Sequence, residues 1–345
     1  MRFRTCLPVP LLLSACTSIG QPPPGYYDSA QGLSGQALRQ ALHDIIDGHT
    51  VQSNASLWTA FQAADARPDG YVWDIYSDIP GGTPPYLFTF VTDQCGTYSG
   101  EGDCYNREHT FPKSWFNDAP PMDTDLHHIF PTDAWVNQHR GNLPYGEVGS
   151  ADWTSQNGTR VGLNTFPGYS GTVCEPIDAY KGDLARTYFY MLTRYMDQIG
   201  SWSSPMLQGT DLAPWAEEML LQWAQDDPVS TKEQDRNNAV FAIQDNRNPY
   251  IDHPEWITAI WGPTAGIVDG QATGAFVYAD ESGVHVRLDR PVSGTITLSD
   301  AIGRTIWTGS INSACYDGGG TLQVPGVYLV TLHQRGATLV RRVVF

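Results

Sequence analysis

The chain has 345 residues, which is enough for one large domain or two domains of ordinary size. Asp and Glu outnumber Lys and Arg by 37 to 20, so the formal net charge is −17. This balance excludes a module that holds a polyanion through a general positive surface. The hydrophobic content of 41% is that of an ordinary globular protein, and Trp and Tyr are abundant.

Residues 1–20 have the pattern of a signal peptide, because Arg2 and Arg4 precede a short apolar run that ends in small residues. Cleavage before Gln21 would release the protein, whereas the segment that ends at Cys16 resembles a lipoprotein cleavage box. We expect a secreted or cell-surface protein, with lipid anchoring through Cys16 as the less favoured route. No other stretch reaches the roughly 20 apolar residues that a membrane-spanning helix needs.

Apolar side chains recur at helical spacing in several later parts of the chain. Ser34 is expected to cap the first helix, and the residues from Ser230 to Glu233 form a capping-box pattern at the last. Two strand-like runs are expected at residues 71–76 and 86–91, on either side of Pro and Gly turn residues. The expected helices begin at Ser34 and Ser56, cover residues 182–198 and 213–225, and begin again near Ser230.

The pattern changes near residue 262, after which short β-rich runs separated by Gly and Asp replace the helical spacing. We therefore expect an α+β protein. Its parts are a mainly helical domain over residues 25–261, a linker over residues 262–270 and a small all-β sandwich over residues 271–345.

Two of the six cysteines lie in the expected leader. Cys95 and Cys104 bracket a short Gly-rich loop, which an exported protein can close with a disulfide. Cys174 and Cys315 fall in different expected domains and are not predicted to pair.

Residues 105–148 hold the densest group of reactive side chains. The expected order is a strand that carries Glu108 and His109, a Pro-rich loop, a second strand at residues 126–130, and a helix. Adjacent side chains of a strand point to opposite faces. Glu108 and His109 can therefore share a site only if the backbone bends there or the site lies at the end of the strand.

The helix is expected to begin at Pro131 and to end at Gly141. Asp133, Asn137 and Arg140 are spaced at i, i+4 and i+7, so they line one face of it.

Hydrolysis of a phosphodiester needs a base that activates water, a divalent cation and a donor that holds the phosphate. His109 is the candidate base, because its ordinary pKa of about 6.5 suits proton transfer near neutrality. Glu108 and Asn137 offer the hard oxygen ligands that Mg²⁺ prefers, with water and phosphate in the remaining positions. Arg140 is a candidate for contact with a phosphate oxygen.

Three blocks of this stretch, NREHTFPKSWF, DLHHIFP and VNQHRGNLPYGEV, resemble the endonuclease I family. A fourth block, QDNRNPYIDHPE, resembles the C-terminal signature of that family, so the likeness covers about residues 25–261. The resemblance implies a secreted or periplasmic nuclease with little sequence specificity, built on a ββα-metal (His-Me) finger that accommodates the Glu-His pair.

By the same likeness His109 is the general base, and Glu108 and Asn137 hold one Mg²⁺ ion together with water. The implied substrate is DNA, with RNA left open. No small-molecule cofactor is expected, and the protein is expected to act as a monomer.

One departure from the family concerns the phosphate. Some members carry an Arg in a longer loop after the Glu-His pair, whereas the corresponding loop here has Lys113. We expect the contact with phosphate to pass to Arg140 or Arg247. Asn142 is expected to line the substrate site or to brace the loop after the helix.

The C-terminal run resembles the sorting domain of the type IX secretion system. The likeness rests on PGVY at residues 325–328 and on the basic, apolar ending RRVVF at residues 341–345. It implies the type IX machinery as a partner in export, a route that favours ordinary leader cleavage.

Two other classes of protein remain as alternatives. An exported zinc hydrolase would use His109, His127 or His128, and His139, although these lack the HExxH arrangement on one helix. The second alternative is an aromatic-rich surface protein that binds glycan. This interpretation does not explain the block of residues that contains Glu108, His109 and Asn137. Outside a zinc site, the histidines other than His109 are expected to be mostly structural.

Overall fold

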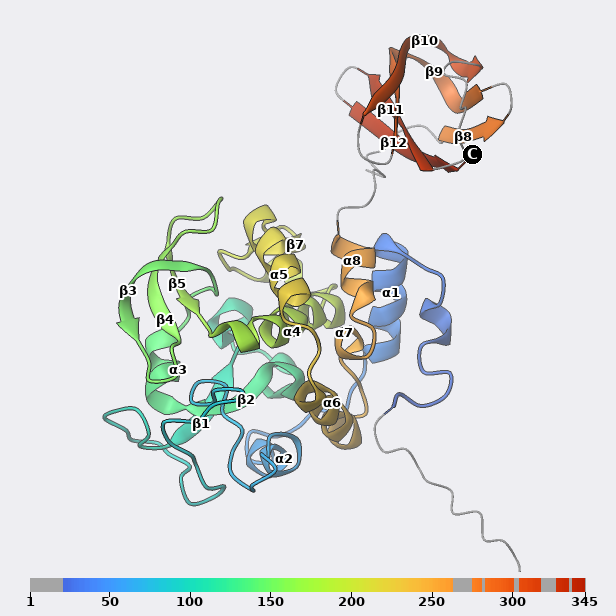
Figure 1. Cartoon of the computed structure of the whole chain (residues 1–345). Coiled ribbons are helices and arrows are strands. Elements are labelled where there is room, and N and C mark those ends of the chain that lie inside the picture. The colour runs from blue at the N-terminus through green and yellow to red at the C-terminus, as the bar shows by residue number, and fades with distance from the viewer. Residues whose placement is uncertain are drawn as a thin grey trace, which may run out of the picture. The chain divides into compact units, whose positions relative to one another are not determined.

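The computed structural model describes residues 21–262, 275–280, 283–300, 304–317, 327–334 and 337–344. The chain divides into two compact units, Met1–Ile260 and Trp261–Phe345 (Figure 1). The expected signal peptide at residues 1–20 and most of the expected linker at residues 262–270 lie outside the described residues. Helices and sheets both occur and the second unit is rich in strands, as expected of an α+β protein. None of the described helices is long and apolar enough to cross a membrane.

The first unit is built around α4 (Lys181–Arg194), in which every residue from Gly182 onward is buried. Half of its 14 residues are aromatic or aliphatic, and its polar residues after Lys181 are buried with them, so this helix is stable only inside a core. The other helices are α1 (Gly35–Ile46), α2 (Leu57–Ala64), α3 (Ala134–Arg140), α5 (Pro214–Asp226), α6 (Thr231–Gln244), α7 (Pro249–Asp252) and α8 (Glu255–Trp261). Helices α1, α5 and α7 contact α4, and Figure 1 shows α5 alongside it.

Of the two helix caps predicted from the sequence, one forms and the other does not. Ser230 and Glu233 form the capping box of α6, each side chain accepting from the other residue's backbone N–H. Ser34 occupies the N-cap position of α1, but its side chain makes no capping hydrogen bond.

The segment that carries the candidate site is a strand, a loop, a second strand and a helix. β1 (Tyr105–His109) pairs antiparallel with β2 (Ile129–Asp133), and α3 follows β2 directly and contacts both strands. The sequence predicts the second strand over residues 126–130, but it begins only after a 3-10 turn at Leu126–His128.

Pro131 lies within β2 rather than at the start of α3, so this part of the sequence prediction is wrong. It faces Arg107 across a sheet of two strands. Both strands of such a sheet are edges, where a residue without an N–H is tolerated. Asp133 caps α3 instead, since its Oδ1 accepts from the backbone N–H groups of Trp135 and Val136, at 2.8 Å each.

The strands predicted at residues 71–76 and 86–91 do not form. Val72 donates its N–H to the Phe88 carbonyl (2.8 Å), but the Asp74 side chain then accepts a backbone N–H two residues further on, which turns the chain away from a ladder. The apolar side chains of both runs still enter the core. Their alternation therefore indicated burial and not strand pairing.

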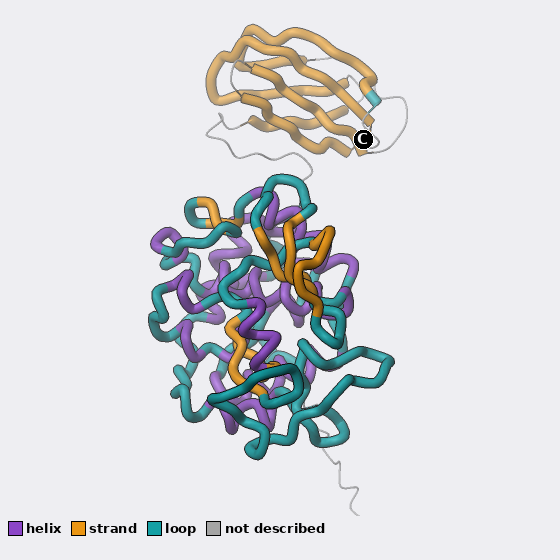
Figure 2. The backbone as a smooth tube through the Cα atoms, turned by 90° about the vertical axis from the view of Figure 1, so that its left-hand side faces the viewer, coloured by secondary structure: helices purple, strands orange, loops and turns teal. Residues whose placement is uncertain are grey.

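Two further small sheets complete the first unit. One has the strands β3 (Val148–Thr154), β4 (Arg160–Asn164) and β5 (Thr172–Glu175), and the other has β6 (Leu207–Gln208) and β7 (Asp211–Leu212). Figure 2 shows these strands as separate groups, apart from β1 and β2. The candidate site is therefore held by a two-stranded sheet and helices, not by one continuous sheet.

The second unit is one antiparallel sheet of five strands. Its strands are β8 (Ala275–Asp280), β9 (Gly283–Asp300), β10 (Thr305–Asp317), β11 (Val327–Gln334) and β12 (Ala337–Val344). The first part of β9 pairs with β8 and its second part with β11, while β10 runs along both. Val284 and Leu298, from the two parts of β9, meet in one apolar core. The sequence predicts a sandwich of two sheets, whereas the structure has a single sheet that the long β9 curls onto itself.

Candidate active site

Strand β1 divides its side chains between two sides. Glu108 faces α3, since its Oε1 lies 2.9 Å from Nη1 of Arg140. Arg107 and His109 point the other way and line an open groove of about 330 Å³. This is the alternation expected of a strand, and His109 is the last residue of β1, so the pair lies at the end of the strand, where both side chains can serve one site.

His109 is held in one tautomer. Its Nε2 lies 3.1 Å from the backbone carbonyl of Asp123, and a carbonyl can only accept, so Nε2 carries the hydrogen and Nδ1 keeps its lone pair. Burial and the neighbouring His128, whose ring lies 5.5 Å away, lower the pKa of His109 to about 3. The imidazole is therefore neutral at pH 7 and able to accept a proton at Nδ1.

Glu108 is only 1% exposed. The hydroxyl groups of Tyr76 and Tyr145 donate to its Oε1 at 2.9 and 3.4 Å, on the same oxygen that pairs with Arg140. Burial raises the pKa of this carboxyl group, and Arg140 opposes the rise. No polar partner for Oε2 exists among the described residues. One carboxylate oxygen is thus saturated and the other is left for a further ligand.

Arg140 fastens α3 to β1. Its guanidinium is 1% exposed, donates to the carbonyl of His109 (2.7 Å) and to that of Thr110, and lies over the ring of Tyr145. All these contacts are inside the protein. The structure therefore does not bring Arg140 into the groove as a phosphate ligand, and its position is that of a brace for Glu108.

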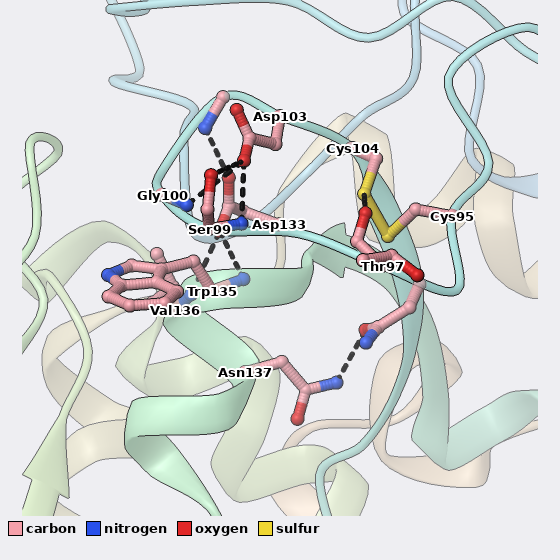
Figure 3. Close-up of a disulfide and its surroundings, with 12 residues drawn as sticks. Cys95, Thr97, Ser99, Gly100, Asp103, Cys104, Asp133, Trp135, Val136 and Asn137 are labelled. Atoms are coloured by element: carbon pink, nitrogen blue, oxygen red, sulfur yellow. Dashed lines mark hydrogen bonds between the residues drawn. A yellow bond between two sulfur atoms is a disulfide. The ribbon is translucent and has the colours of Figure 1, made fainter.

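Asn137 turns its amide nitrogen toward β1. Nδ2 donates to Asn106 Oδ1 (2.7 Å) and to the carbonyl of Arg107 (3.3 Å), and Figure 3 shows the amide oxygen on the side away from this partner. Like Glu108 Oε2, this oxygen has no partner in the part of the chain that the structure describes. A carboxylate oxygen and an amide oxygen fit Mg²⁺, which takes one or two protein ligands and keeps several waters.

The histidines do not form a zinc site. Within the described ranges, no three His, Cys, Asp or Glu side chains converge so that they could hold a metal ion. His127 and His128 are buried, each with a ring nitrogen bonded to a backbone carbonyl (3.1 and 2.6 Å), and His139 stacks on Trp153 with 4.1 Å between the ring centres. Their contacts are structural, as expected for most of them.

Two cations, Arg107 and Lys113, line the groove beside His109. Lys113 is paired with Asp118 at 2.9 Å. Arg107 is not among the site residues predicted from the sequence, although it belongs to the same block as the Glu-His pair. Strand periodicity was the signal that could have found it, because residues two apart in a strand share a face. The groove is lined by Asn54, Trp58, Cys95, Asn106, Arg107, His109 and Lys113.

The two residues predicted to bind substrate are not brought to His109. Arg247 is 2% exposed, and its guanidinium donates to Asp252 (2.6 and 2.7 Å) and Asn238 (2.8 Å). Asn142 is exposed just beyond the end of α3 and does not line the groove. Arg247 thus has a structural position, and a role of Asn142 in binding finds no support in the groove.

The predicted disulfide between Cys95 and Cys104 is present and closes a loop beside the site (Figure 3). Cys104 immediately precedes β1, and Cys95 lines the groove. The bond therefore ties a wall of the groove to the strand that carries His109. Cys174 and Cys315 are free, as expected.

Activation of water by a neutral imidazole is the chemistry of a hydrolase, and this is the class of protein to which the site points. The profile of the Endonuclease I family matches residues 34–255. The protein therefore belongs to the endonuclease I family, and it is a nuclease.

Several secreted nucleases are similar to this chain. An extracellular ribonuclease of Bacillus amyloliquefaciens is 36% identical over 249 residues, which are 68% of this chain and 78% of the relative. An extracellular ribonuclease of Bacillus subtilis (strain 168) is 35% identical over 246 residues, with the same shares. An extracellular deoxyribonuclease of Aeromonas hydrophila is 24% identical over 257 residues, 70% of this chain and 96% of the relative. These names agree with a secreted protein.

Proposed function

We propose that the protein is a secreted endonuclease that requires a divalent metal ion and hydrolyses phosphodiester bonds of DNA and RNA with little sequence specificity. The observation that carries the proposal is the neutral His109 in the wall of the groove, with Nε2 tied to a carbonyl and Nδ1 left to take a proton. Nucleases of this family generally depend on a divalent metal ion. Relatives named as ribonucleases and as a deoxyribonuclease support both substrates.

His109 acts as the general base. Its Nδ1 takes a proton from the attacking water, and the bond from Nε2–H to the Asp123 carbonyl stabilises the imidazolium that forms. A phosphate in the groove brings negative charge close to the ring and raises the pKa of His109 toward the range useful for proton transfer. A positioned base of this kind contributes about 10²–10⁴ in rate.

Glu108 and Asn137 are the residues that would hold the metal ion, through Oε2 and Oδ1. When bound, the ion supplies positive charge that stabilises the phosphate and the leaving oxygen. We assign β1, β2 and α3 to a ββα-metal finger, with the base on β1, an amide ligand on α3 and Arg140 as the brace between them.

The second unit is proposed to serve export. The type IX likeness falls in part on β11 and β12, while residues 325 and 326 lie outside the described residues. The relatives named extracellular support a secreted location. Lipid anchoring at Cys16 concerns a residue outside the described part of the chain.

The test is cleavage of supercoiled DNA and of RNA by the full chain with Mg²⁺, with and without EDTA, beside the variants His109→Ala and His139→Ala. We expect both substrates to be cut, EDTA to stop cleavage, and His109→Ala to lower the rate about 10²–10⁴-fold. His139→Ala is the matched control, since His139 stacks on Trp153 and does not line the groove. Full activity of His109→Ala would remove His109 from the mechanism, and cleavage that withstands EDTA would remove the metal ion.

A further inference from the structure

Arg107 differs from every other cation that the structure describes between residues 21 and 262. Residues 21–262 contain twelve Lys and Arg side chains, and eleven of them lie within ion-pair distance of a carboxylate. Arg107 is the twelfth, and within the described residues no carboxylate pairs with it. In a chain whose net charge is −17, the cation that no acid neutralises is the one placed to meet an external anion.

The guanidinium of Arg107 is held on one edge and one face. Its Nη1 donates to the carbonyl of Asn54 (2.7 Å) and to Asn54 Oδ1 (3.1 Å), and its Cζ lies 5.0 Å from the ring centre of Trp58. Nε and Nη2 have no hydrogen-bond partner in the part of the chain described here. These two nitrogens form the edge of a guanidinium that binds phosphate oxygens in a bidentate way.

The position of this edge suits the reaction. Arg107 and His109 share a face of β1, about 6.6 Å apart along the strand, and both line the groove. The half-buried guanidinium has no ion-pair partner among the described residues, and a partly desolvated charge without a counter-charge costs free energy. A phosphate oxygen would offset that cost while placing the nucleic acid beside the base.

We propose that Arg107 binds a backbone phosphate of the nucleic-acid substrate through Nε and Nη2. In this role it supplies the cation that neither Arg140 nor Arg247 provides. Asn54 and Trp58 are positioning residues, because they fix the orientation of the guanidinium. The inference rests on the proposed nuclease function and names the residue that holds its substrate.

The test compares the full-length wild type with Arg107→Ala, Arg107→Lys and Arg304→Ala, using a single-stranded oligonucleotide with Mg²⁺. Arg304→Ala is the matched control, since it removes the same charge from a side chain that is 78% exposed in the second unit. We expect Arg107→Ala to lower kcat/KM about tenfold to a hundredfold, mainly through KM, as for the loss of a hydrogen bond to a charged group. The slope of log kcat/KM against log salt should become shallower by about 0.7, the value for one phosphate contact on a single strand.

Arg107→Lys separates the charge from the geometry. Lys retains the positive charge but not the planar edge, so the salt slope should stay that of the wild type while KM rises. Arg304→Ala should change neither KM nor the salt slope. Thermal unfolding midpoints of all variants are measured to check that they remain folded. A wild-type KM and salt slope in Arg107→Ala would overturn the inference, as would a wild-type KM in Arg107→Lys.

Binding to the same oligonucleotide in EDTA, followed by fluorescence anisotropy, makes the two proposals separable. If the wild type cuts nucleic acid and Arg107→Ala matches it in KM, slope and binding, the nuclease proposal stands and the role of Arg107 falls. If the wild type cuts nothing but Arg107→Ala binds the oligonucleotide more weakly than Arg304→Ala does, the phosphate site stands and the proposed reaction falls.

Discussion

The buried pair of Glu108 and Arg140 is the residue-scale feature on which the site depends. Two charges at about 1% exposure are tolerable because they neutralise each other and because tyrosine hydroxyls and backbone carbonyls bind part of their remaining groups, while Arg140 Nε has no partner among the described residues. The contacts at Oε1 fix the orientation of the Glu108 carboxylate, and its second oxygen, Oε2, stays available for a further ligand. Arg140 thus serves the site without reaching the groove.

Removal of Arg140 should therefore act on stability before it acts on chemistry. Arg140→Met leaves an uncompensated buried carboxylate, so the free energy of unfolding should fall by about 3–5 kcal/mol in urea denaturation. Arg304→Met breaks an exposed pair and should cost about 0–1 kcal/mol. An Arg140→Met protein of normal stability that lacks activity would instead place Arg140 in the reaction.

The pH dependence of the free enzyme follows from the lowered pKa of His109. A base with a pKa of about 3 is deprotonated at all higher pH values, and it loses function only as the pH falls through that value. We expect kcat/KM to show no protonation limb from His109 between about pH 5 and 8, although free histidine titrates near 6.5. A pH–rate profile of the wild type tests this, and a limb near pH 6.5 would contradict the lowered pKa of the imidazole.

At the scale of elements, the site is a strand and a helix fastened at both ends. The Arg140 contacts join the last residue of α3 to the end of β1, and the disulfide anchors the segment that leads into β1. Asp133 links the same loop to α3, since its Oδ2 accepts the backbone N–H of Gly102 while Oδ1 caps the helix. Rigid supports of this kind hold His109 on β1 and Asn137 on α3 in a fixed relative position, although the sheet that carries them has two strands.

Loss of the disulfide should be measurable in stability. For a separation of nine residues, loop closure predicts that Cys95→Ser with Cys104→Ser lowers the free energy of unfolding by about 2.5 kcal/mol. Denaturation of the wild type with added reductant should show the same loss, and the double variant should not respond to reductant. Cys315→Ser, at an exposed free thiol, is the control and should match the wild type.

On the scale of the whole molecule, every residue assigned to the reaction lies in the first unit. Nearly all of the described cations of that unit are paired with carboxylates, so the protein has no broad positive field there and contacts nucleic acid through local groups. A protein of this kind should bind its substrate with a shallow salt dependence.

A chain that ends at Gly262 should therefore keep the nuclease activity of the full protein. The first unit has its own core around α4, and no site residue comes from the second unit. The measurement is kcat/KM of the shortened and full chains on the same substrate, after their unfolding transitions have been compared. A folded but inactive shortened chain would show that the second unit contributes to the reaction.

The sequence by itself determined what depends on neighbours along the chain. The order of strand, loop, strand and helix, the capping box at Ser230 and the Cys95–Cys104 pairing all follow from local spacing and strand or helix periodicity. The family blocks added the class of enzyme.

Tertiary structure decided which side chains reach the groove. Arg140 and Arg247 have the right chemistry for a phosphate, yet both are buried, Arg140 against Glu108 of β1 and Arg247 against Asp252, five residues along the chain. Arg107 remains because Asn54, from a segment far away in the sequence, occupies one edge of its guanidinium, and no carboxylate among the described residues forms an ion pair with it. The burial of a side chain depends on contacts between distant segments, so no local pattern could have ranked these three cations.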